Sequence, residues 1–156
     1  MRQFLLIALI IVQSTVLLAQ KVVNNDLVVA GSVVVKEKYL FSALDSVKLL
    51  VIVDGERVQE LNLEKKGRFE IVLELEGEYI LKFTRPGYHS KTLFVETAVD
   101  PAAENREFGY TYTRFNVKLE KKRAMDETDT NFWVGKIYFE PSKGVFIHTM
   151  FETAPE

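Results

Sequence analysis

The sequence contains no cysteine, and histidine and proline are scarce. Its 156 residues include 0 Cys, 2 His and 4 Pro. A chain without cysteine can form no disulfide framework, thiolate metal site or thiol nucleophile. The two histidines stand outside any H-x-H or H-E-x-x-H motif, so we interpret His89 as an exposed loop residue and His148 as a strand residue. We therefore expect no bound metal and no cofactor.

Neither sign of charge is in large excess. There are 20 Lys and Arg against 22 Asp and Glu, which gives a net charge of −2. This balance lacks the positive footprint of a nucleic-acid-binding protein, and we expect no nucleic-acid partner. The apolar fraction of 47% excludes a disordered acidic chain, and the length is sufficient for the core of one domain.

Motifs for catalysis and ion binding are missing as well. No G-x-S-x-G elbow is present, so we expect no catalytic residues and no enzymatic activity. The basic run Lys121–Arg123 is short and acids follow it at once, which favours a solvated face over a phosphate or membrane patch. The segment Asp126–Asp129 has the oxygen density of half a calcium loop but lacks the closing bidentate Glu, and we interpret it as a solvated loop.

The first twenty residues have the layout of a secretory signal peptide. Arg2 provides a positive start, the apolar run Phe4–Val12 follows, and Ala19 is the small residue expected at the cleavage site. Cleavage there would make residues 1–19 the signal peptide and Gln20 the start of the mature chain. The alternative is an uncleaved anchor, for which the apolar stretch is short against the roughly 20 residues of a spanning helix.

We therefore expect export to the periplasm or to the outer-membrane or extracellular side. The mature chain should have no membrane span. No cysteine follows the apolar run, so the sequence does not predict a lipoprotein.

The rest of the chain has the pattern of an all-β protein. Short runs of β-branched and aromatic residues recur between turn signals, and no helix of normal length is supported. Asp100 and Pro101 favour one short helical turn in the polar connection 97–107. The predicted strands are residues 27–35, 47–53, 57–63, 68–75, 79–85, 91–96, 108–119, 133–140 and 145–151.

Alternation within these runs predicts a core. Apolar residues occupy every second position of 68–75 and 79–85, as in half-buried antiparallel strands. The continuous apolar run 47–53 is typical of a strand covered on both faces. The predicted core residues are Phe69, Ile71, Leu73, Tyr79, Leu81 and Phe83.

An aromatic row is the candidate binding site. Phe108, Tyr110 and Tyr112 share one parity of the strand 108–119, whereas Phe115, Val117 and Leu119 share the other. In a regular strand the three rings would stand opposite the core, where exposed rings can bind a ligand. Two alternatives bury them: a β-bulge near Thr113 that returns both sets to one core, or cover by the C-terminal hairpin.

The order of several motifs resembles the carboxypeptidase regulatory-like domains, which are prealbumin-like or transthyretin-like sandwich modules. The resemblance covers Val28–Thr97, and residues 98–156 look like the C-terminal extension of such modules in secreted Bacteroidetes proteins. The connection Lys36–Phe41 departs from the family, which often has a Gly-x-Pro turn there. The motifs are Val51-Ile52-Val53, Gly67-Arg68-Phe69, Gly77-Glu78-Tyr79-Ile80-Leu81-Lys82-Phe83 and Pro86-Gly87-Tyr88.

The resemblance implies an antiparallel Greek-key β-sandwich in residues 20–97, with a C-terminal β-hairpin extension packing on the same domain. It implies no catalytic residues. We expect a non-catalytic exported binding or structural module of the cell envelope, whose partner is an unknown protein or glycan. The alternative is a carbohydrate-binding domain that uses the aromatic row.

Overall fold

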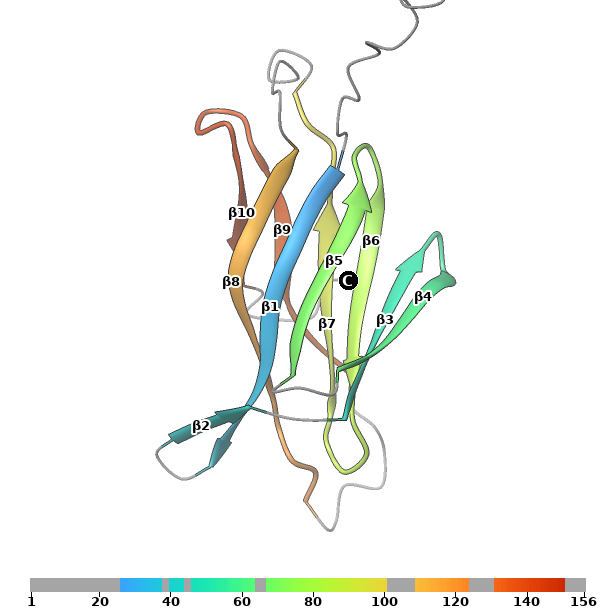
Figure 1. Cartoon of the computed structure of the whole chain (residues 1–156), viewed down its shortest axis with the longest axis vertical. Coiled ribbons are helices and arrows are strands. Elements are labelled where there is room, and N and C mark those ends of the chain that lie inside the picture. Colours follow the sequence, from blue (N-terminus) through green and yellow to red (C-terminus); the bar gives the residue numbers. More distant parts are fainter. Residues whose placement is uncertain are drawn as a thin grey trace, which may run out of the picture.

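A computed structural model of the chain consists of two facing β-sheets (Figure 1). It describes residues 26–37, 40–43, 46–63, 67–100, 109–123 and 131–150. The predicted signal peptide 1–19, the helical turn from Pro101 and the segment Asp126–Asp129 lie outside the described residues. No helix of the described ranges is long and apolar enough to cross a bilayer.

The strands of the described ranges follow one another without an intervening helix. They are β1 (Asp26–Glu37), β2 (Leu40–Ala43), β3 (Val47–Val53), β4 (Glu56–Leu63), β5 (Arg68–Glu74), β6 (Glu78–Thr84), β7 (Ser90–Glu96), β8 (Tyr110–Leu119), β9 (Asn131–Glu140) and β10 (Val145–Thr149). The all-β prediction is confirmed, and most predicted strand bounds agree within two residues.

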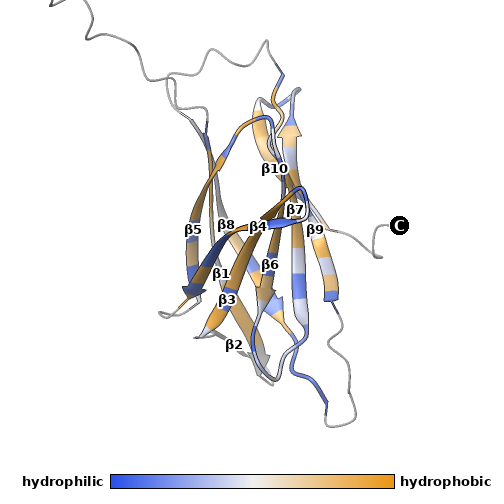
Figure 2. Cartoon of the chain, turned by 90° about the vertical axis from the view of Figure 1, so that its right-hand side faces the viewer, coloured by the Kyte–Doolittle hydropathy of each residue, from blue (hydrophilic) through white to orange (hydrophobic). Residues whose placement is uncertain are grey.

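The two layers form a sandwich, as predicted. One sheet has the order β2-β1-β5, with β8 on the other side of β1, and the second has the order β10-β9-β7-β6-β3-β4. Figure 2 shows the layers from the side, with β1, β5 and β8 on the left and β6, β7 and β9 on the right. The hairpin of β9 and β10 is part of the second sheet and joins it beside β7.

Two pairings differ from the purely antiparallel arrangement that we expected. β1 pairs with β8 in parallel, and β7 pairs with β9 in parallel. Tight hairpins join only antiparallel neighbours, whereas these pairs join strands that are separated by longer stretches of chain. The sequence also missed β2, because residues within the predicted connection Lys36–Phe41 pair β1 with β2, with Glu37 opposite Leu40.

The core lies between the sheets and is built by alternation. In β5 the side chains of Phe69, Ile71 and Leu73 are buried, and Val72 points outward with 58% of its surface exposed. Leu81 and Phe83 of β6 are fully buried, which confirms the predicted core. Tyr79 is the half-buried member. Its hydroxyl donates to the carbonyl oxygen of Glu74 at 3.2 Å near the rim of the sandwich.

The strand β3 is covered on one face only, which corrects the expectation from its apolar run. Val47, Leu49 and Val51 are buried, but the intervening Lys48 is exposed and Leu50 is half-buried. The outward positions of this strand belong to the surface of the second sheet. The pattern therefore differs from that of a strand with a layer on each side.

Replacing Leu73 by Ala should lower the free energy of unfolding by about 2–5 kcal/mol, because the side chain is buried and its loss leaves a cavity. Glu70→Ala on the outward face of the same strand should change it by less than about 0.5 kcal/mol. Urea unfolding of both variants checks the assignment. Equal losses would contradict the inward and outward faces of β5.

Candidate functional site

The structure does not place the predicted aromatic row on an open face. Phe108 lies outside the described residues. Tyr110 is buried, with 6% of its surface exposed, and Tyr112 is half-buried against the core. Burial also raises the pKa of the Tyr112 hydroxyl. Neither described ring stands as a flat platform for a ligand.

A β-bulge in β8 explains this burial. Tyr112 pairs with Val29 and Phe115 pairs with Gly31, so three steps along β8 match two steps along β1. An extra residue reverses the parity of the side chains after it, so both aromatic sets face one core. Gly31 permits the close approach, because a Cβ there would lie 2.1 Å from the carbonyl oxygen of Phe115.

The C-terminal hairpin covers the start of β8. The ring of Tyr110 lies 5.3 Å from the ring of Phe146 and 5.5 Å from that of Phe139, in edge-to-face contacts. Phe139 and Phe146 also contact each other. Aromatic rings in this geometry stabilise one another beyond the gain from area burial. The β-bulge and the cover by the C-terminal hairpin were stated as alternatives. In the structure both are present, and together they bury Tyr110.

His148 packs inside the same hairpin. It lies on β10 with its ring 4.7 Å from that of Phe115. Its Nε2 atom is buried and has no hydrogen-bond partner among the described residues, and burial lowers the pKa of the imidazole. Gly135 of β9 makes room, since a Cβ there would lie 2.5 Å from Nε2. His148 is thus half-buried between Phe115 and Gly135.

His89 lies in the connection before β7, as expected, but it is buried rather than exposed, which corrects the expected exposure. Its backbone N–H donates to the carbonyl oxygen of Glu120 at 2.9 Å. Its ring contacts Phe132 edge-on, with 5.4 Å between centroids. Within the described ranges, no group of three or more His, Cys, Asp or Glu side chains is placed to hold a metal ion.

A short two-stranded ribbon joins the sheets near His89. We call residues 87–89 and 120–122 the basal ribbon. Lys122 donates its backbone N–H to the Gly87 carbonyl oxygen at 2.9 Å, and Tyr88 is bridged to Lys121. Residues 87–89 follow β6 of one sheet and residues 120–122 follow β8 of the other (lower end of Figure 1).

The first of two pockets beside the ribbon combines a ring with cations. We call it the aromatic pocket; its volume is about 460 Å³. Phe132 is 38% exposed, and the Lys91 ammonium lies 4.3 Å from the centre of its ring. Lys91 also forms an ion pair with Glu120 at 3.3 Å. The lining residues are Val35, His89, Lys118, Leu119, Glu120, Lys121, Arg123 and Phe132.

The second pocket, with a volume of about 410 Å³, is lined by cations and neutral polar groups. We call it the hydroxyl pocket. Lys48, Arg85 and Lys122 carry its charge, and no carboxylate is among the lining residues that the structure describes. Its neutral polar residues are Ser46, Asn62, Thr84, Tyr88 and Ser90.

Sequence reasoning missed both pockets. The run Lys121–Arg123 was interpreted as a solvated face, because three basic residues followed by acids carry little signal alone. The structure adds Lys48 and Arg85 from β3 and the end of β6, and Lys118 from β8. The signal that could have found the site is the Pro86-Gly87 turn, which brings the end of β6 to the basic run.

Comparisons with known proteins identify no family for this chain. No protein-family model matches the sequence, and no curated protein matches it. The chain is similar to a solved catechol 1,2-dioxygenase from Acinetobacter sp. ADP1, with 11% identity over 69% of this chain and 58% of that chain, and a TM-score of 0.43. The corresponding enzyme of Acinetobacter radioresistens gives 14% identity over 69% and 57% of the two chains, with a TM-score of 0.37.

This finding corrects the expected function. The solved structures that the chain resembles are enzymes, not non-catalytic binding or structural modules of the cell envelope and not carbohydrate-binding domains. The chain matches little more than half the length of these enzymes. At this identity and TM-score, no activity, substrate or metal is transferred from them to this chain.

Tyr110→Ala should lower the free energy of unfolding by roughly 3 kcal/mol or more, because it removes a buried ring that packs against Phe139 and Phe146. Thr111→Val, at the exposed neighbouring position, should change it by less than about 0.5 kcal/mol. Thermal and urea unfolding measure both. A Tyr110→Ala variant as stable as the parent would contradict the burial of the Tyr110 ring in the core.

Proposed function

We propose that this chain binds a small organic anion in the aromatic pocket, namely a carboxylate attached to an apolar ring or chain. The observation that carries the proposal is the partly exposed ring of Phe132 beside the cationic side chains of Lys118, Lys121 and Arg123. Small-molecule sites of this kind combine an apolar wall with a few polar groups that fix orientation.

The apolar wall can bury the ring of a ligand. Phe132 is one of the large apolar residues of the described ranges that remain exposed, although it sits in a pocket with Val35 and Leu119. Covering it with an apolar group removes that surface from water, which favours binding. The edge contact from His89 and the Lys91 ammonium over its face hold the Phe132 ring in place.

The charges of the lining favour an anion. Among the described lining residues, Glu120 is the one carboxylate, and it is ion-paired with Lys91. Lys118 and Lys121 therefore favour a negatively charged ligand at the pocket. An anionic head group placed there would gain charge-assisted hydrogen bonds, which are stronger than neutral ones. The predicted ligand is amphipathic, with one charged and one apolar end.

Isothermal titration calorimetry with sodium benzoate tests this proposal. Benzoate should bind more tightly than benzamide, which lacks the charge, and more tightly than acetate, which lacks the ring. Lys121→Gln should weaken benzoate binding about three- to tenfold, because it removes one charged donor from a partly solvated site. Phe132→Ala should weaken benzoate binding and leave acetate binding unchanged.

Lys143→Gln is the matched control, because it removes one positive charge in the exposed β9–β10 turn. It should leave the affinity for benzoate unchanged. Equal binding of benzamide and benzoate, or an equal loss in Lys121→Gln and Lys143→Gln, would contradict the proposal.

A further inference from the structure

The hydroxyl pocket differs from the aromatic pocket in the chemistry of its walls. Among the described residues that line it, the charged ones are all cationic, namely Lys48, Arg85 and Lys122, although the whole chain has more acidic than basic residues. Ser46, Asn62, Thr84 and Ser90 add neutral hydrogen-bonding groups. Such a wall offers many hydrogen-bond donors. It suits a compact oxyanion with several acceptor oxygens.

The basal ribbon separates the two pockets. Successive side chains of an extended strand point to opposite sides. Lys121 and Arg123 accordingly line the aromatic pocket, and Lys122 lines the hydroxyl pocket. On the other strand of the ribbon, His89 lines the first pocket and Tyr88 lines the second. The two pockets are therefore separate sites.

The contact of Arg85 with Tyr88 favours oxyanion binding. Its guanidinium carbon lies 5.1 Å from the centre of the Tyr88 ring, so the planar group is held against that ring. The paired N–H donors of a guanidinium group match two oxygens of a phosphate group. Lys122 is fixed from the other strand, where its backbone N–H bonds to Gly87.

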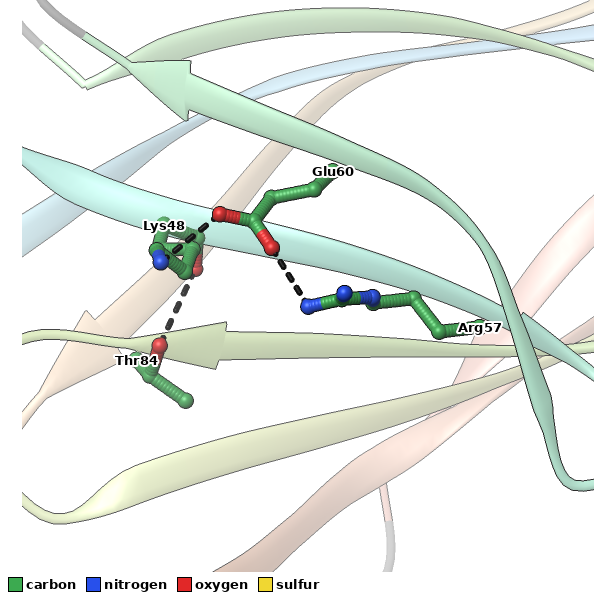
Figure 3. A network of polar contacts seen from close by, with 4 residues as sticks. All are labelled: Lys48, Arg57, Glu60 and Thr84. Carbon is green, nitrogen blue, oxygen red and sulfur yellow. Dashed lines mark hydrogen bonds and ion pairs between the residues drawn. The ribbon is translucent and has the colours of Figure 1, made fainter.

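Lys48 is partly neutralised by an acidic neighbour on β4. Its ammonium forms an ion pair with Glu60 at 2.7 Å, and Glu60 also binds Arg57 at 2.7 Å (Figure 3). The hydrogen bond from Lys48 lowers the pKa of Glu60, so this carboxyl is ionised at neutral pH. Thr84 donates its hydroxyl to the Lys48 carbonyl oxygen at 3.5 Å. Glu60 thus competes with an anionic ligand for the ammonium group of Lys48.

We propose that the hydroxyl pocket binds a phosphate group, with Arg85 and Lys122 as its main ligands and Lys48 as a third cation held back by Glu60. The pocket volume of about 410 Å³ has room for more than the phosphate itself, so the group can belong to a phosphorylated small molecule. This site goes beyond the proposed function, and it stands on different residues.

The test is isothermal titration calorimetry of the full chain with inorganic phosphate at low ionic strength, where screening is weak. Arg85→Gln and Lys122→Gln should each weaken phosphate binding about tenfold. Glu60→Gln should strengthen it, because the variant releases Lys48 from its ion pair. This opposite sign separates a binding site from general damage to the fold.

Lys143→Gln is again the charge-matched control and should leave phosphate binding unchanged. Benzoate binding should persist in Arg85→Gln, so that failure of this site and failure of the aromatic pocket give different results. Tighter binding of glycerol 3-phosphate than of inorganic phosphate would assign the group to a phosphorylated small molecule, and the reverse would assign it to free phosphate. Both results support the site.

Three results would overturn the proposal. The first is the absence of phosphate binding to the parent chain. The second is an equal loss of affinity in Arg85→Gln and Lys143→Gln. The third is a Glu60→Gln variant that binds phosphate no more tightly than the parent. If Arg85→Gln does not fold, Lys122→Gln and Glu60→Gln still decide the outcome.

Discussion

The hydrogen bonds of the basal ribbon connect the two sheets at the end where both pockets lie. His89 donates to the carbonyl oxygen of Glu120, and Lys122 donates to that of Gly87, each at 2.9 Å. The first strand of the ribbon leads into β7 and the second continues from β8, so these bonds cross between the layers. Both pockets depend on them, because each is lined by residues of both strands.

The ribbon also distributes the short basic run Lys121–Arg123 between the two pockets. Three consecutive basic residues on a free loop would share one solvated surface. Held in an extended pair, they are divided, with Lys121 and Arg123 on one side and Lys122 on the other. The hydroxyl pocket then gains Lys48 and Arg85 from segments that are distant in sequence. A chain with a net charge of −2 can therefore carry a locally cationic end.

Much of the fold could be predicted from the sequence, because its signals are local. The alternation in β5 depends on neighbouring residues, and it is present in the structure. The parallel pairs β1–β8 and β7–β9 could not be predicted, since nothing in a strand's own sequence fixes a distant partner. The bulge in β8 could be predicted only as an alternative, because apolar residues occupy odd positions in one half of the strand and even positions in the other. The pairing of Gly31 with Phe115 shows that the bulge is present.

The candidate site could not be predicted for the same reason. Lys48, Arg85 and Lys122 are far apart in the sequence and meet only through the pairing of β3 with β6 and through the ribbon. Conversely, the predicted aromatic row had a clear sequence pattern, but its member Tyr110 is part of the core because the rings of Phe139 and Phe146 cover it. A pattern shows which side chains share a face, and tertiary packing decides whether that face meets water.

The central claim is that the ribbon separates two anion pockets of different chemistry. Amide chemical-shift mapping on isotope-labelled protein tests it directly, with phosphate and benzoate titrated in turn. The account predicts that phosphate shifts the amides of Arg85, Tyr88 and Thr84, whereas benzoate shifts those of Phe132 and Leu119. One common set of shifted amides for both anions, or shifts confined to residues away from the ribbon, would contradict it.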